Sequence, residues 1–177
     1  MAFMLYAEST CRDASAQQER RDISYQRIGL NEYKNFIVGW DVGSKPQRIA
    51  YIRTLRDYNR VFQPAATNGS RGPFGPPEES FSKEHILVVA RIMPAPMNVD
   101  AVFSVVHLQE EGETLKLSYG YNPPAAASYD IRGFLALRIP AKAYKRVVFI
   151  ENGKEIGDLG LGKGSWIVPQ IASEGDQ

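Results

Sequence analysis

The sequence lacks the residues from which disulfide frameworks and most metal sites are built. Its 177 residues include a single cysteine, Cys11, and two histidines, His85 and His107. An intrachain disulfide is therefore impossible, which excludes a small disulfide-stapled fold. Structural zinc sites usually take four protein ligands and catalytic ones three, and no H-E-x-x-H pattern is present. We predict no metal site and no cofactor, and Cys11 is expected to be an incidental thiol because no histidine lies near it in the sequence.

The sequence also lacks a strong excess of either charge and any long hydrophobic run. Lys and Arg total 21 against 20 Asp and Glu, a formal net charge of +1. Nucleic-acid binding draws most of its affinity from basic side chains in excess, so no nucleic-acid partner is predicted. No stretch approaches the roughly 20 apolar residues of a membrane span. The apolar residues 1–7 are too short for a signal peptide and lack a preceding positive charge, which leaves the compartment open.

Signatures of catalysis are missing as well. No G-x-S-x-G elbow is present. Residues 157–165 nearly match a phosphate-binding loop, but Gly164 stands where a Ser or Thr must follow Lys163, and no helix is expected after it. The acidic pairs at 78–79 and 110–111 are expected in solvated turns rather than facing each other across a cleft. The sequence therefore predicts no enzyme, with an unrecognised carboxylate site as an alternative.

The two histidines are expected to have structural positions. His85 precedes an apolar run and is predicted to lie at the surface or in a turn. His107 belongs to an alternating segment and is predicted to be half-buried, on the same face as Phe103 and Val105.

What the sequence does contain is a succession of short β-forming segments separated by turn signals. We expect strands at 23–28, 36–40, 47–53, 86–90, 102–108, 114–119, 134–140 and 146–150. The continuous apolar run 86–90 predicts a central strand buried on both faces. A hairpin is expected to join 102–108 to 114–119 through a charged turn at 109–113, and Asn152 with Gly153 predicts a type I′ turn.

One short helix is expected among the strands. Thr54 is followed three residues later by Asp57, an acidic variant of the capping box. Leu55, Tyr58, Val61 and Phe62 then recur at helical spacing until Pro64. The sequence thus predicts a mostly-β fold: a sandwich or partly open barrel of about eight short strands with one flanking short helix.

We divide the chain into a polar amino-terminal arm (1–22), a single β-rich domain (23–157) and a Gly-rich carboxy-terminal tail (158–177). The arm and the tail are predicted to become ordered in a complex, because polar segments can fold over a partner's surface. Three loops, at 63–80, 91–100 and 120–130, are candidate docking surfaces. The first holds four prolines and the segment 72–77, which resembles a polyproline ligand.

Aromatic side chains in these loops are the predicted partner-binding residues. They are Tyr119, Tyr121 and Tyr129, which flank the prolines at 123–124, and Phe74 in the first loop. Tyrosine suits recognition because it offers a large contact area and a polar tip. The alternative is that some of these tyrosines fill the ends of the sheets as core.

The stretch 49–151 resembles the PrcB carboxy-terminal domain family, which is linked to bacterial protease-complex subunits. The features that carry the resemblance are, in order, the helix with Asp57, Tyr58 and Phe62; residues 81–84 leading into 86–89; the hairpin around Gly112; the 123–124 loop; and the pair 135–140 and 145–149. In place of the Gly-rich tract that family members often carry after the buried strand, this chain has 93–97.

The resemblance implies a β-rich, non-catalytic domain, often exported, that binds or stabilises a protein partner. We therefore expect a protein-binding or complex-stabilising module, an accessory subunit of a bacterial assembly. An alternative from another class is a small-molecule carrier that holds its ligand in the barrel mouth.

Overall fold

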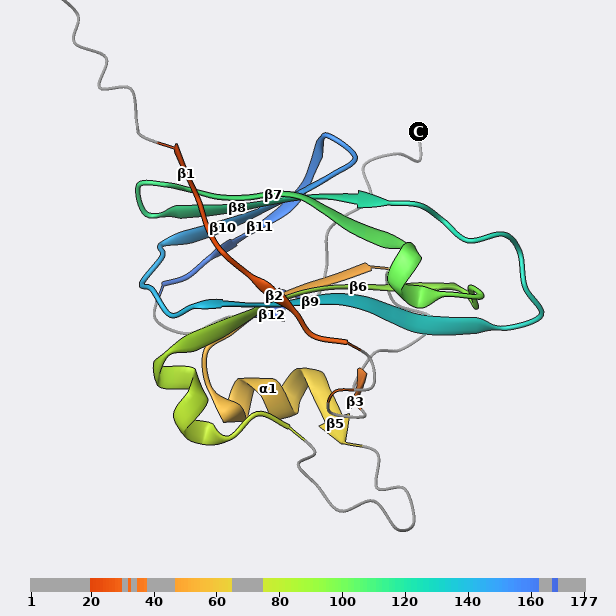
Figure 1. The fold of residues 1–177 in the computed structure, drawn as a ribbon, viewed down its shortest axis with the longest axis horizontal. Coiled ribbons are helices and arrows are strands. Elements are labelled where there is room, and N and C mark those ends of the chain that lie inside the picture. The colour runs from red at the N-terminus through yellow and green to blue at the C-terminus, as the bar shows by residue number, and fades with distance from the viewer. Residues whose placement is uncertain are drawn as a thin grey trace, which may run out of the picture.

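In the computed structural model, two five-stranded sheets lie face to face (Figure 1). The structure describes residues 20–29, 32, 35–37, 47–64, 75–162 and 167–168. The first sheet has the order β1 (Arg20–Asp22), β7 (Phe103–Glu111), β8 (Thr114–Tyr121), β10 (Arg146–Glu151), β11 (Lys154–Gly160). The second has the order β12 (Ile167–Val168), β4 (Gln47–Ile52), β6 (Glu84–Pro94), β9 (Asp130–Pro140), β2 (Gln26–Arg27). The mostly-β prediction is confirmed, and of its two forms the chain adopts the sandwich.

Two apolar clusters occupy the two faces of the second sheet. One fills the space between the sheets and includes Leu87 and Val89 of β6. The other lies on the outer face, where Ile86 and Val88 pack with side chains of α1 (Leu55–Val61), which covers that face (Figure 1). Strand β6 is therefore buried on both faces, as its unbroken apolar run predicted.

Helix α1 begins where the sequence predicts and ends earlier. The amide of Asp57 donates to the Thr54 hydroxyl at 3.1 Å, and that hydroxyl donates to Oδ2 of Asp57 at 2.8 Å. The predicted capping arrangement is thus confirmed. Phe62 already has extended backbone angles and starts the short strand β5 (Phe62–Pro64), which pairs with β3 (Asn35–Ile37). Pro64 disfavours helical angles at Gln63, so the helix could not have continued to the proline.

Both predicted hairpins form. In the β10–β11 hairpin, Asn152 and Gly153 have φ of 49° and 82°, the positive pair that a type I′ turn requires. The β7–β8 hairpin is tighter than expected: both strands extend until Glu111 faces Thr114, with Gly112 at φ 59° in the turn. Glu110 and Glu111 consequently lie in β7, so their prediction as turn residues is wrong.

A β-bulge in β7 overturns the prediction for His107. The pairing with β8 shifts between Val105 and His107, which leaves Val106 as the extra residue. A bulge breaks the in–out alternation of a strand, so His107 is exposed instead of sharing the inner face with Phe103. The core-facing alternation resumes at Leu108.

The amino-terminal part of the described chain joins the two sheets. Residues 20–29, here called the N-terminal strap, place β1 at the β7 edge of the first sheet and β2 at the β9 edge of the second (Figure 1). On the other side of the sandwich, β11 is the edge of the first sheet and β12 the edge of the second. Strand pairing therefore extends beyond the boundaries drawn at 22 and 157.

Three loop predictions change. The loop predicted at 120–130 is reduced to 122–129, between β8 and β9. Residues 91–94 belong to β6, so the loop predicted at 91–100 is reduced to 95–98 followed by the short 3-10 helix η2 (Val99–Ala101). The loop predicted at 63–80 contains the end of β5 and the start of the 3-10 helix η1 (Glu78–Ser82). Cys11 and residues 72–74 of the proline-containing segment, which include Phe74, lie outside the described residues.

Candidate functional site

An apolar groove of about 490 Å³ lies at one end of the sandwich, between two loops. One wall is formed by the segment that comes after β6 in the chain and includes η2, and the other wall is formed by the loop after β8. The lining residues are 95–98, 101–102 and 122–126. None of them is charged, and alanine and proline predominate.

Backbone hydrogen bonds fix the two walls relative to each other. The amide of Asn122 donates to the carbonyl of Val102 at 2.9 Å, and the amide of Ala95 donates to the carbonyl of Tyr129 at 3.0 Å. Prolines within both loops restrict the backbone further because each fixes its own φ. The groove is therefore a preformed part of the fold, held by the strands on which its loops end.

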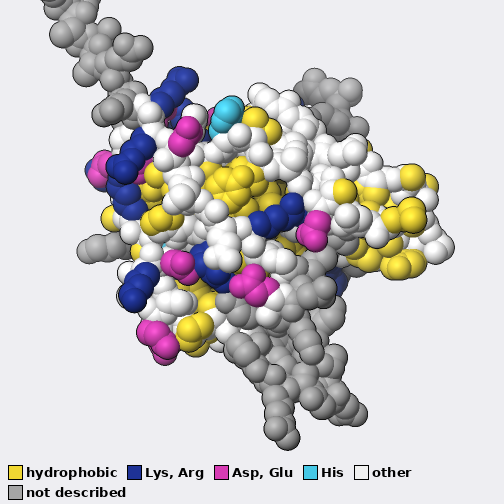
Figure 2. Space-filling view, in the orientation of Figure 1, with side chains coloured by type: hydrophobic (Ala, Val, Ile, Leu, Met, Phe, Trp, Pro, Cys, Tyr) yellow, Lys and Arg dark blue, Asp and Glu magenta, His cyan; other side chains and the backbone are white. Residues whose placement is uncertain are grey.

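Two large apolar side chains are exposed in the loops that form or adjoin the groove. Met97, a lining residue, is 109% exposed, and Tyr129, which directly precedes β9 and accepts a backbone hydrogen bond from the lining residue Ala95, is 65% exposed. Figure 2 shows hydrophobic side chains gathered at the right-hand end of the molecule, over the loops that follow β6 and β8. A contiguous exposed apolar patch usually marks a docking surface, and methionine adapts to partners of different shape.

The three predicted tyrosines have different environments. Tyr119 is 1% exposed and belongs to the inter-sheet core. Tyr121 is partly buried, with its ring 5.4 Å from that of Phe103 and with the Arg91 guanidinium 4.3 Å from its centroid. Tyr129 is exposed. The core alternative thus holds for Tyr119, which is too buried to contact a partner, whereas Tyr129 stays a predicted partner contact.

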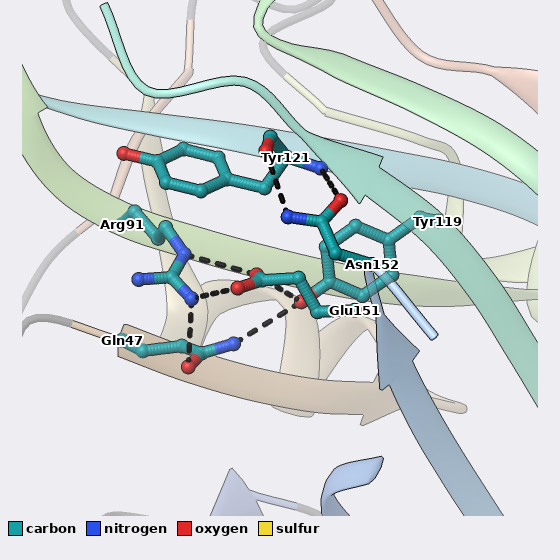
Figure 3. A network of polar contacts seen from close by, with 6 residues as sticks. All are labelled: Gln47, Arg91, Tyr119, Tyr121, Glu151 and Asn152. Carbon is teal, nitrogen blue, oxygen red and sulfur yellow. Dashed lines mark hydrogen bonds and ion pairs between the residues drawn. The ribbon is translucent and has the colours of Figure 1, made fainter. Parts of the chain in front are cut away.

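A polar network crosses from one sheet to the other beneath Tyr121 (Figure 3). Arg91 of β6 donates to Glu151 of β10 at 2.5 and 3.1 Å, and the Tyr119 hydroxyl donates to the same carboxylate at 2.8 Å. Gln47 of β4 donates to Tyr119 at 3.1 Å and accepts from Arg91 at 3.2 Å. Burial, together with the charge of Glu151, raises the pKa of Tyr119.

This network is structural in character. Both oxygens of Glu151 are occupied by donors, and Arg91 and Glu151 are 16% and 11% exposed. Paired buried charges of this kind hold partners in a fixed register. Asn152 extends the arrangement by exchanging two 3.0 Å hydrogen bonds with the backbone of Tyr121. Sequence reasoning missed the network because its members are far apart in the chain and resemble no motif.

A second polar cluster contains His85 and Tyr51. His85 lies in β6, and its Nδ1 shares a 2.6 Å hydrogen bond with the Tyr51 hydroxyl. Its predicted position at the surface or in a turn is wrong, because β6 begins one residue earlier and leaves the side chain only partly exposed. Burial, assisted by the positive charge of Arg53, lowers the pKa of His85 to about 4. Burial likewise raises the pKa of Tyr51.

The buried carboxylate Glu110 is linked to this cluster through Lys142, whose carbonyl accepts from the Tyr51 hydroxyl at 3.3 Å. It is 8% exposed and accepts from Lys142 at 2.7 Å and from Tyr144 at 3.3 Å. The hydrogen bond from Lys142 lowers the pKa of Glu110, whereas burial and then the Glu110 charge raise the pKa of Tyr144 to about 12. A carboxylate held ionised by a lysine is a poor general acid, so this pairing favours a structural role.

Two further properties concern only the described part of the chain. No group of three or more His, Cys, Asp or Glu side chains there is arranged to hold a metal ion. None of the helices in those same ranges has the length and apolar character needed to traverse a bilayer.

Fold and surface together define a two-sheet β-sandwich with an apolar groove at one end. Comparison with family models, curated proteins and solved structures finds no match for this chain.

Proposed function

We propose that this chain is a non-enzymatic protein-binding or complex-stabilising module that docks its partner in the apolar end groove. The observation that supports the proposal is the groove itself, which has uncharged walls and an exposed lining residue, Met97. The exposed Tyr129 is joined to the groove through its carbonyl, which accepts from the amide of the lining residue Ala95. Apolar concave surfaces ringed by adaptable or aromatic side chains are typical of interaction sites.

The chemistry of the walls indicates the kind of partner. The side-chain amides of Asn98 and Asn122 are the polar groups among alanines, prolines, a methionine and a valine. An uncharged, extended segment with small or apolar side chains would fit these walls, with its backbone groups available to the two amides. A charged segment would lose solvation there without gaining a counter-charge.

The family resemblance supports the same proposal from another direction. It implies a non-catalytic accessory domain of a bacterial protease complex, often exported, that binds or stabilises another protein. We retain the accessory-subunit role and the bacterial origin as parts of the proposal.

Site-specific photo-crosslinking tests the docking site. A photoreactive phenylalanine analogue at Met97 is expected to capture one defined protein in the cells that make this chain. The matched control places the same analogue at Val106, which is 57% exposed on the β7 bulge outside the groove, and is expected not to capture that protein. Tyr129→Ser in the Met97-labelled chain is expected to reduce the crosslink several-fold, since aromatic anchors carry much of an interface's affinity.

Equal capture from positions 97 and 106 would show nonspecific contact and contradict the docking site. Native mass spectrometry of the purified chain tests the alternative that it is a small-molecule carrier. A small molecule that stays bound to the wild type and is lost in Met97→Asp would show that the groove binds a small ligand, and would contradict the protein-docking proposal.

A further inference from the structure

A basic side chain of the N-terminal strap reaches one wall of the apolar groove. Nη1 of Arg27 donates to the carbonyl of Asp100 at 3.1 Å and to the carbonyl of Phe103 at 3.2 Å. Ala101 and Val102, which lie between these two carbonyls in the chain, line the groove. One guanidinium nitrogen therefore holds both ends of this part of the wall.

The other terminal nitrogen of Arg27 extends the contact to a side chain. Nη2 lies 3.4 Å from Oδ1 of Asp100, and this buried atom makes no hydrogen bond. Buried donors nearly always have a hydrogen-bond partner, and Nη2 is an exception. Its contribution to the contact with η2 is therefore the charge attraction to Asp100. The amide of Asp100 in turn donates to Oδ1 of Asn98, a groove residue, at 3.0 Å. The guanidinium is thus connected through η2 to the far end of the same wall.

The remaining strap contacts lie elsewhere on the sandwich. Arg20 pairs with Glu111 at 2.6 Å, at the opposite end of β7 from Phe103. The amide of Ile23 donates to the carbonyl of Leu108 at 2.8 Å, and the amide of Ile28 donates to the carbonyl of Ala136 at 2.9 Å. These bonds fasten the strap to the two sheets. Among the side-chain contacts described for the strap, those of Arg27 reach η2.

We propose that Arg27 is a positioning residue for the groove, and that attachment of the N-terminal strap and docking of a partner are coupled. Release of the strap removes the anchor of η2 and lets the wall move. Because coupling between two sites is reciprocal, a partner bound to the ordered wall stabilises the strap. The coupling to a partner rests on the proposed function, whereas the control of the wall by Arg27 does not.

Amide hydrogen exchange on the protein alone tests the control of the wall. In Arg27→Met, which keeps the apolar stem, the amides of Ala101 and Asn122 are expected to exchange roughly tenfold faster, because hydrogen bonds from a charged donor are lost. These amides report on the wall since they donate to Asn98 and Val102. Amides in the centres of β8 and β10 are expected to be unchanged, and Arg20→Met, which removes the same charge from the same strap, is the matched control.

Unchanged exchange at both wall amides, or an equal increase across the sandwich, would overturn the positioning role. Arg27→Lys is a second variant, for the case that Arg27→Met detaches the whole strap. It keeps the charge but has a single ammonium group, so amide exchange at the wall is expected to accelerate less than in Arg27→Met. The amides of Ile23 and Ile28 are expected to stay protected, which would show that the strap is still attached.

The second measurement is the crosslink yield from position 97, which Arg27→Met is expected to lower several-fold. Arg20→Met is expected to leave the yield unchanged, because the exposed pair of Arg20 with Glu111 contributes little to the attachment of the strap. A yield insensitive to Arg27→Met would refute the coupling while leaving the groove as a docking site. If wild-type protein gives no crosslink at all, the proposed function fails, but the exchange experiment still decides the role of Arg27.

Discussion

At the scale of single residues, His85 shows how the fold sets the charge of a side chain. Half-burial and the nearby Arg53 lower its pKa to about 4 from the usual 6.5. In the unfolded chain His85 takes up its proton as the pH falls through 6.5, whereas in the folded chain it stays neutral until about pH 4. The unfolded state then binds more protons across this interval, so folding stability must fall as the pH falls from 6.5 to 4.

We expect the difference in unfolding free energy between wild type and His85→Asn to depend on pH. Asparagine cannot titrate but keeps a polar partner for the Tyr51 hydroxyl. The stability of the wild type relative to the variant should be constant above about pH 7 and decline between pH 6.5 and 4. Denaturant unfolding of both proteins at several pH values measures this, and carboxylate titrations common to both cancel in the difference. A pH-independent difference would show that His85 is not held neutral by the fold.

At the scale of elements, α1 depends on its first turn. The amide of Asp57 and the Thr54 hydroxyl satisfy each other, and Asp57 is 4% exposed. Thr54→Ala should lower the free energy of unfolding by about 1 kcal/mol, because a buried carboxylate and a helix-end amide both lose a partner. Thr54→Ser should retain most of the stability. Arg56→Ala, at an exposed position of the same helix, is the control, and equal losses in Thr54→Ala and Arg56→Ala would rule out a special role for the cap.

Local patterns explain which elements the sequence predicts correctly. The α1 cap, the Asn152–Gly153 turn and the doubly buried β6 each depend on residues close together in the chain. The bulge at Val106 and the extension of β6 through Arg91 depend instead on register with strands distant in sequence, which local periodicity does not encode. For the same reason the sequence predicts its two loops as separate candidate surfaces and does not predict that they form one groove.

At the scale of the whole molecule, the Arg91–Glu151 pair ties one sheet to the other across the core. Both side chains are largely buried, so Glu151→Ala leaves Arg91 without its counter-charge and should cost about 3 kcal/mol of folding stability. Asp158→Ala, which breaks the exposed pair with Arg146, should cost less than about 1 kcal/mol. Combining Glu151→Ala with Arg91→Met should cost less than the sum of the single changes. Additive losses, measured by denaturant unfolding, would show that the two charges are not coupled.

The N-terminal strap also has a consequence for the order of assembly. Arg20 of the strap and its partner Glu111 are 91 positions apart in the chain. The strap can pair only after β7 and β9 have formed. Contacts of such long sequence separation form late in folding. Because β1 and β2 are edge strands, the strap can detach without separating the other strands of either sheet, so two nearby copies of the chain could exchange straps and form a swapped dimer. We therefore expect the side of the sandwich that the strap closes to form late in folding and to be the place where copies of the chain exchange segments.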